Sequence, residues 1–233
     1  MSMSIRYWLF VGCTLLLVGF VSYGVFATQR LLRTWQPDRN LLLIPGENIL
    51  RLGLITLCIL LGLGSGLDWR QLGWVLDNSK QQLLLGVLWG SLLAIFFAII
   101  TQWITQRSGR RFYSAVVIKA IMPTNRRELG LILLAMIPVA LLEELIFRSL
   151  LVGGLTPLLP ALGLVFVTSL LFGLMHVLQG IWGVIGATLA GILFGLLFIH
   201  QGSLLTPLIA HYMANVLQIG QAMRLREPMM KLG

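Results

Sequence analysis

The chain has 233 residues, of which 58% are apolar and only 11% are charged, and its mean hydropathy is +0.91. A typical soluble domain carries about 25% charged residues, so this composition excludes an ordinary soluble domain and indicates an integral membrane protein. The net charge of +9 arises from 17 Lys and Arg against 8 Asp and Glu. Basic loops that orient a membrane protein account for this excess, and we expect no nucleic-acid partner.

Charge-free stretches predict the membrane helices in chain order. The first four apolar stretches cover residues 7–29, 52–67, 81–106 and 129–152, the last interrupted by three charged residues. Residues 149–223 then carry no formal charge, a length that holds three more helices at ~20 residues each. Turn-forming residues place the breaks at 153–160, near 179–180 and at 200–203. Continuous apolar runs differ from the alternating strands of a membrane barrel. The predicted fold is therefore all-α, a polytopic transmembrane helix bundle of about seven spans, with eight as the alternative.

The distribution of Lys and Arg predicts the orientation. Residues 28–51 contain four, residues 105–128 contain six and the tail after Ala222 contains three, whereas the alternate loops contain three in total. By the positive-inside rule, the amino terminus is external and the carboxyl terminus is cytoplasmic. Residues 7–27 also resemble a signal peptide that ends at Ala27, but 21 apolar residues exceed the usual apolar region of about 7 to 15 and favour a helix.

Six strongly polar residues remain at membrane depth in the second half of the chain. They are Glu143, Glu144, Arg148, His176, His211 and Asn215. An ionised side chain at the centre of a membrane helix costs about 2.5 to 3.5 kcal/mol. These residues must therefore face one another or a water-filled cavity, and such a cluster indicates a functional site.

Helical spacing assigns these polar residues to faces. Glu144 lies four residues before Arg148 and faces it, whereas Glu143 points about 100° away and is the candidate free carboxylate and general base. His176 lies four residues after Phe172, on one face of the fifth predicted helix. Placed linearly in their spans, Glu143 and His176 differ in depth by roughly 10 Å. We therefore expect bent helices, with Pro138 and Gly173 as the candidate positions.

Small residues recur every four positions along the sixth predicted helix. The stripe consists of Gly183, Ala187, Gly191 and Gly195. Such stripes allow close approach of neighbouring helices, and we predict packing inside the bundle rather than a dimer interface. Trp182 is interpreted as an interfacial anchor, together with the other tryptophans near predicted helix ends.

Three motifs resemble those of the CAAX protease and bacteriocin-processing family, also called CPBP or Abi. Residues 143–148 (EELIFR) resemble its EExxxR motif, residues 172–176 its FxxxH motif and residues 211–215 its HxxxN motif. The family consists of intramembrane endopeptidases, including the CAAX prenyl protease 2 type. The resemblance divides the chain into an amino-terminal transmembrane scaffold with cytoplasmic basic loops (1–127), a protease core (128–222) and a basic cytoplasmic tail (223–233). Ser149 follows the first motif where many family members have Gly.

The resemblance implies a role for each motif residue. Glu143, assisted by His176, would activate a water molecule, while His211 and Asn215 would stabilise the oxyanion. The supporting residues would be Glu144, Arg148 and Phe172. Glu143, His176 and His211 also satisfy the ligand set of a catalytic divalent metal such as zinc. The same residues suit a metal-free mechanism, and the sequence leaves both open.

The predicted function is hydrolysis of a peptide bond within the membrane, in CAAX-type processing or in bacteriocin and peptide processing or self-immunity. The partners are membrane lipid and a peptide or membrane-protein substrate, and no oligomeric state is predicted. Buried Glu, His and Arg also build ion relays. An ion- or proton-coupled transporter is therefore the first alternative, and a non-catalytic immunity or scaffold protein of the same fold is the second.

Overall fold

The computed structural model describes residues 3–35, 39–108 and 120–230, and all regular elements within these ranges are helical. The long helices are α1 (Ile5–Thr34), α2 (Pro45–Gly64), α3 (Ser79–Ser108), α5 (Arg126–Glu144), α6 (Ala161–Leu174), α7 (Ile181–Gln201) and α8 (Leu205–Met230). Short 3-10 helices cover Leu41–Leu43 (η1) and Val177–Gln179 (η3), and a π-helix (η2, Leu145–Gly153) continues α5. The prediction of an all-α transmembrane helix bundle is confirmed; the described residues form seven long helices, five of which belong to segments long and apolar enough to be spans, against the seven spans predicted.

Five segments are long and apolar enough to cross a membrane. They are Ile5–Leu32, Pro45–Gly64, Ser79–Ile104, Arg126–Gly153 and Ile181–Gln201. The most apolar stretch of each is at most 39% buried inside the protein, so large apolar side chains such as Leu16 and Leu162 face outward. Water-soluble proteins rarely expose apolar surfaces of this extent. The chain is an integral membrane protein.

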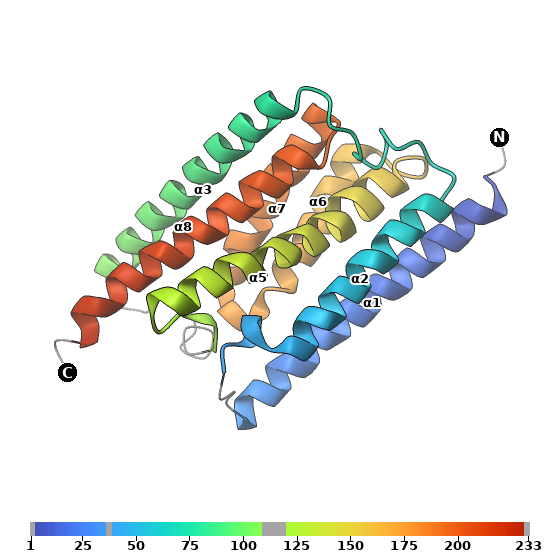
Figure 1. Ribbon diagram of the computed structural model, residues 1–233. Coiled ribbons are helices and arrows are strands. Elements are labelled where there is room, and N and C mark those ends of the chain that lie inside the picture. The colour runs from blue at the N-terminus through green and yellow to red at the C-terminus, as the bar shows by residue number, and fades with distance from the viewer. Residues whose placement is uncertain (1–2, 36–38, 109–119, 231–233) are drawn as a thin grey trace.

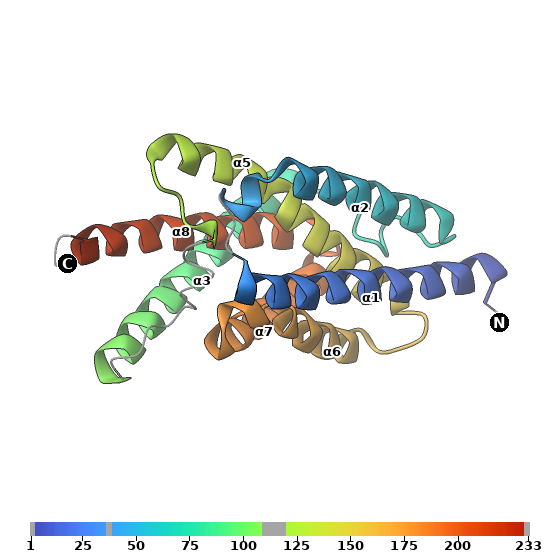
Figure 2. The ribbon, with the colours of Figure 1, turned by 90° about the horizontal axis from the view of Figure 1, so that it is seen from below.

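The helices pack around three apolar clusters. Side chains of α1, α2, η2 and α6 form the first, those of α3, α7 and α8 the second, and those of η1, α5 and α8 the third. Helix α3 runs along α8, while α1 and α2 lie together on the other side of α5 (Figures 1 and 2). The two termini lie at opposite ends of the bundle (Figure 1). This arrangement encloses the end of α5, the π-helix η2 and the first half of α8, which carry five of the six polar residues.

Several helices extend beyond the charge-free stretches that predicted them. Helix α2 begins at Pro45, so Arg51 lies in its second turn rather than in a loop. Helix α5 begins after Asn125, whose side chain accepts a hydrogen bond from the backbone N–H of Glu128 at 2.9 Å. Such caps satisfy the free N–H groups of a first turn, so polar residues are included in the helix ends. Most of the basic loop between α3 and α5 lies outside the described residues.

The small-residue stripe of α7 packs inside the bundle, as predicted. A Cβ atom at Gly195 would lie only 2.8 Å from Val165 Cγ1, and one at Gly191 would lie 3.0 Å from Ser169 Cβ. Val165 and Ser169 belong to α6, so the stripe faces that helix. The absence of side chains at the two glycines therefore sets the distance between α6 and α7.

Helix α6 is too short to cross a bilayer. Its 14 residues extend about 21 Å, less than a hydrocarbon core of about 30 Å. His176 follows its end in a turn, so the prediction that His176 lies on the face of a spanning helix is wrong. The short helix offers a physical account of the expected 10 Å mismatch with Glu143, because the chain turns back before it reaches the far surface.

Candidate active site

The first motif lies where α5 changes into the π-helix η2. Glu143 and Glu144 end α5, and Arg148 lies within η2, every residue of which is buried. π-Helical segments are rare and occur frequently at functional sites. Since burial removes access to water, the polar side chains of this segment require partners inside the protein.

Arg148 has two such partners. Its Nη1 atom donates to Glu144 Oε1 at 3.0 Å, and its Nη2 atom donates to the backbone oxygen of Gly191 at 3.1 Å. The side chains of Arg148 and Glu144 are 2% and 0% exposed. The spacing of four residues predicted this ion pair, and the structure places it against the small-residue stripe of α7.

His211 of α8 lies between the two glutamates. Its Nδ1 atom is 2.8 Å from Glu144 Oε1, and its Nε2 atom is 3.5 Å from Glu143 Oε2. An ionised carboxylate only accepts hydrogen bonds, so Nδ1 donates to Glu144. With both ring nitrogens protonated, the charges of His211, Arg148 and the two glutamates sum to zero. This balance accounts for four ionisable groups in an apolar surrounding.

Aromatic rings hold His211 and Arg148 in place. Phe194 stacks on His211 with ring centroids 5.0 Å apart, and Phe172 meets the same ring edge to face at 5.9 Å. The guanidinium carbon of Arg148 lies 4.9 Å from the Phe172 centroid and 5.4 Å from that of Phe194. Phe172 therefore contacts both His211 and Arg148, which suits its predicted supporting position.

His176 lies in the turn after α6. Its Nδ1 atom is 2.7 Å from the backbone oxygen of Phe172, and the two rings are 4.5 Å apart. Donation from Nδ1 to this carbonyl leaves Nε2 as the acceptor of a neutral ring. The ion pairs of the described residues join Glu143 to His211 and not to His176. His176 can therefore assist Glu143 only through a bridging group, such as a water molecule.

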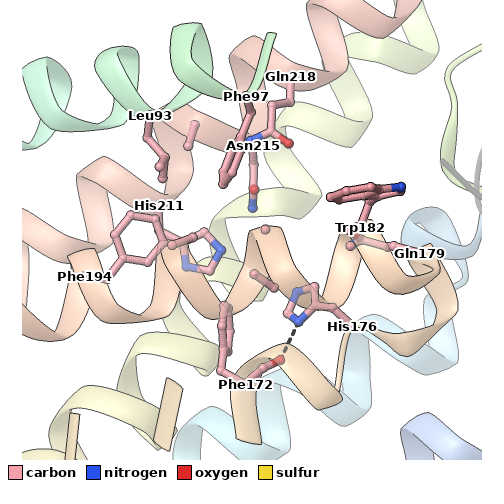
Figure 3. Close-up of a pocket in the computed structure, with 15 residues that line it drawn as sticks. Leu93, Phe97, Phe172, His176, Gln179, Trp182, Phe194, His211, Asn215 and Gln218 are labelled. Carbon is pink, nitrogen blue, oxygen red and sulfur yellow. Dashed lines mark hydrogen bonds between the residues drawn. The ribbon is translucent and has the colours of Figure 1, made fainter. Parts of the chain in front are cut away.

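A cavity of about 90 Å³ joins His176, His211 and Asn215. This volume is sufficient for several water molecules. The three side chains reach the cavity from the turn after α6 and from α8 (Figure 3). The remaining lining residues are Leu93, Phe97, Phe172, Gln179, Trp182, Gly183, Gly186, Ala187, Ala190, Phe194, Ala214 and Gln218. Glu143 does not line this cavity and is connected to it through His211 Nε2.

Sequence reasoning missed three residues of the cavity wall, Gln179, Gln218 and Trp182. Gln179 lies three residues after His176, and Gln218 lies seven residues after His211. Both spacings keep a side chain on the same side as its motif histidine, so the pattern contained this signal. Trp182, interpreted as an interfacial anchor, lines the cavity at the start of α7.

Arg51 is a further residue that the sequence did not indicate. It interacts electrostatically with Glu143 across the contact between α2 and α5. Its Nη1 atom donates to Asn48 Oδ1 at 3.0 Å, and Glu47 lies 3.7 Å away. The i,i+4 spacing of Glu47 and Arg51 was a signal of helix at this position. Arg51 thus adds positive potential beside the partly exposed Glu143.

The described residues do not fit a metal centre. Among them, no group of three His, Cys, Asp or Glu side chains is arranged to hold a metal ion. The candidate ligands Glu143, His176 and His211 are therefore not gathered around one point, although a zinc site requires such convergence. For this reason, no metal is used in the mechanism below.

The family comparison covers the segment that contains all three motifs. The family described as Rce1-like, type II CAAX prenyl endopeptidase Rce1-like, matches residues 125–217. This segment is Rce1-like. The match confirms the predicted resemblance to CAAX proteases and includes every motif residue from Glu143 to Asn215. No curated protein and no solved structure matches the chain. Helices α1 to α3 lie outside the Rce1-like segment, yet α3 contributes Leu93 and Phe97 to the cavity wall.

Proposed function

We propose that the chain is an intramembrane endopeptidase of the CAAX type that hydrolyses a peptide bond with an activated water. The contacts of His211 carry this proposal. Its ring contacts Glu144 through Nδ1 and Glu143 through Nε2, and it lines the cavity together with His176 and Asn215. The match to the Rce1-like family supports a protease over other uses of buried ionisable groups.

In the proposed reaction, a water molecule at the edge of the cavity beside His211 Nε2, the atom that connects Glu143 to the cavity, bridges Glu143 and His176. Glu143 takes a proton from this water, and the oxygen of the water forms a bond to the carbonyl carbon of the substrate. Asn215 Nδ2–H and His211 Nε2–H donate to the oxyanion that develops on the carbonyl oxygen. Glu143 then returns the proton to the leaving amine as the C–N bond breaks. One water is consumed and two peptide ends are released.

Glu144 and Arg148 support this reaction without taking part in it. Glu144 accepts from Nδ1 of His211 and so directs Nε2 toward Glu143 and the substrate. Arg148 neutralises Glu144 and fixes its position through Gly191. The Arg148 guanidinium lies over the rings of Phe172 and Phe194. We therefore assign these two residues to the stability and geometry of the site.

The proposed substrate is a peptide or membrane protein that reaches the site from the lipid. A prenylated protein ending in Cys-aliphatic-aliphatic-X is the substrate class that the match to type II CAAX prenyl endopeptidases suggests, and a bacterial peptide precursor is the second class. We also propose an external amino terminus and a cytoplasmic carboxyl terminus, because the basic residues are concentrated in alternate loops.

The direct test is cleavage by the Glu143→Gln variant. The wild-type protein and the variant are purified in lipid nanodiscs and given a quenched fluorescent peptide with a prenylated Cys-aliphatic-aliphatic-X end. We expect cleavage by the wild-type protein and a decrease in kcat of about 10²- to 10⁴-fold in the variant, since the general base is lost. Asp77→Asn removes a carboxylate from an exposed ion pair with Arg70 and is the matched control.

Three outcomes would contradict the proposal or part of it. Cleavage at the wild-type rate by Glu143→Gln would show that another group activates the water. Ion flux into proteoliposomes that depends on Glu143, without any cleavage, would instead favour the transporter alternative. Activity that disappears with a chelator and returns with zinc would show that a metal, and not Glu143 alone, activates the water.

A further inference from the structure

Three carboxamide side chains line the cavity. They belong to Asn215, Gln179 and Gln218, and hydrogen bonds between the described residues leave all three without a partner. Among the lining residues, the one hydrogen bond drawn joins the His176 ring to the Phe172 carbonyl (Figure 3). By contrast, Gln71 donates to Thr156 at 2.9 Å. All three are partly exposed on the cavity wall, so their donors and acceptors are open to a polar ligand.

The small volume of the cavity favours one conformation of this ligand. The cavity measures about 90 Å³, whereas an α-helix with its side chains is about 10 to 12 Å across. One turn of such a helix, about 5.4 Å long, occupies roughly 400 Å³, several times the volume of the cavity, so the cavity favours an extended chain over a helix. Unwinding exposes the N–H and C=O groups of the substrate, and these are costly in a membrane without partners. A carboxamide offers both donors and an acceptor without adding charge.

Each glutamine follows a motif residue by three positions. Gln218 follows Asn215 on α8 with a rise of about 4.5 Å, which falls between the advance of one residue (about 3.3 Å) and of two residues (about 6.6 Å) in an extended chain. On the opposite wall, the backbone N–H of Gln179 donates to the backbone oxygen of His176 at 2.9 Å. Each glutamine is therefore fixed close to a motif residue, and Trp182 lies in the same part of the cavity (Figure 3).

We propose that Gln179 and Gln218 bind the main chain of the substrate beside the scissile bond, and that the enzyme accepts its substrate as an unwound, extended segment. This inference rests on the proposed endopeptidase activity. The two amides contact the substrate equally before and during the reaction, so they contribute uniform binding. Loss of uniform binding raises KM and leaves kcat unchanged.

The test measures KM and kcat separately for Gln218→Met and Gln179→Met. Each full-length variant in nanodiscs is given the prenylated fluorescent peptide described above. We expect KM to rise about 3- to 10-fold, the equivalent of one hydrogen bond, and kcat to stay within twofold. Gln221→Met is the matched control, because Gln221 lies one turn further on α8 and does not line the cavity. Its KM should equal that of the wild-type protein.

A binding measurement separates this inference from the proposed activity. The probe is the same peptide with a reduced, non-hydrolysable scissile bond, and its Kd is measured by fluorescence anisotropy. A Kd that rises in both glutamine variants without cleavage by the wild-type protein would contradict the activity and support the binding role. Cleavage that requires Glu143, with KM and Kd unchanged in both variants, would contradict the binding role alone. A wild-type protein that does not bind the probe would also overturn the inference.

Discussion

The two sides of His211 differ in exposure and in the partners they offer. On the Nδ1 side, Glu144 and Arg148 are 0% and 2% exposed and bind each other and the backbone of α7. On the Nε2 side, Glu143 is 29% exposed, and its ion pair with His211 is long, at 3.5 Å. Two adjacent glutamates thus have different environments. A buried carboxylate held by Arg148 and His211 through one oxygen serves structure, whereas a partly exposed carboxylate beside a cavity is available for chemistry.

Removing the cation of the buried side should have the largest effect. Arg148→Met leaves Glu144 buried without its counter-charge, and we expect the free energy of unfolding to fall by about 3 to 5 kcal/mol. Chemical unfolding in detergent micelles measures this loss. The control Arg70→Met breaks the exposed pair with Asp77, which should cost no more than about 1 kcal/mol. Equal losses of unfolding free energy in the two variants would show that the buried pair contributes no more to stability than the exposed pair.

A change on the cavity side should affect the rate and leave stability intact. Asn215→Ala removes an oxyanion donor, and we expect kcat to decrease about 10²- to 10³-fold. The unfolding free energy should stay close to that of the wild-type protein, because the Asn215 amide has no partner among the described residues. Asn215→Asp keeps the size of the side chain and removes the NH₂ donors, so its kcat should decrease by a similar factor. A large rise in KM at constant kcat would contradict the oxyanion role.

A change in the contact between α6 and α7 should lower the stability of the whole bundle, and so affect the Nδ1 side and the Nε2 side of His211 alike. Gly195→Ala places a Cβ atom 2.8 Å from Val165 Cγ1, and overpacking of this kind costs about 1 to 3 kcal/mol. The control Gly163→Ala places its Cβ in open space on α6 and should be neutral or slightly stabilising. Thermal unfolding of both variants measures the difference. Equal melting temperatures would show that the stripe does not limit the approach of the helices.

The sequence predicted those features that depend on local spacing. Long charge-free runs predicted the helices, and the four-residue spacing of Glu144 and Arg148 predicted their ion pair. The predicted position of His176 on a helix face was wrong, because hydropathy does not show that α6 ends after 14 residues and that a turn follows. The π-helix after Glu144 also leaves no mark in a periodic pattern, since it changes the backbone hydrogen bonds and not the residue types.

Contacts between helices were beyond prediction for a different reason. Periodicity assigns His211 to a face of its helix, but it does not determine which neighbour that face meets. Only the packed bundle shows that His211 reaches both glutamates and that Gln218 joins the same cavity. The three motifs identified the chemistry of the site, and the tertiary packing divided it into a buried side and an open side.

The measurement that tests this division most directly compares Glu143→Gln with Glu144→Gln for both cleavage and unfolding. For Glu143→Gln, we expect kcat to fall about 10²- to 10⁴-fold with an unchanged free energy of unfolding. For Glu144→Gln, we expect the free energy of unfolding to fall by about 3 to 5 kcal/mol, because Arg148 loses its buried partner. A stable, inactive Glu144→Gln together with an active or unfolded Glu143→Gln would contradict the assignment of the two carboxylates.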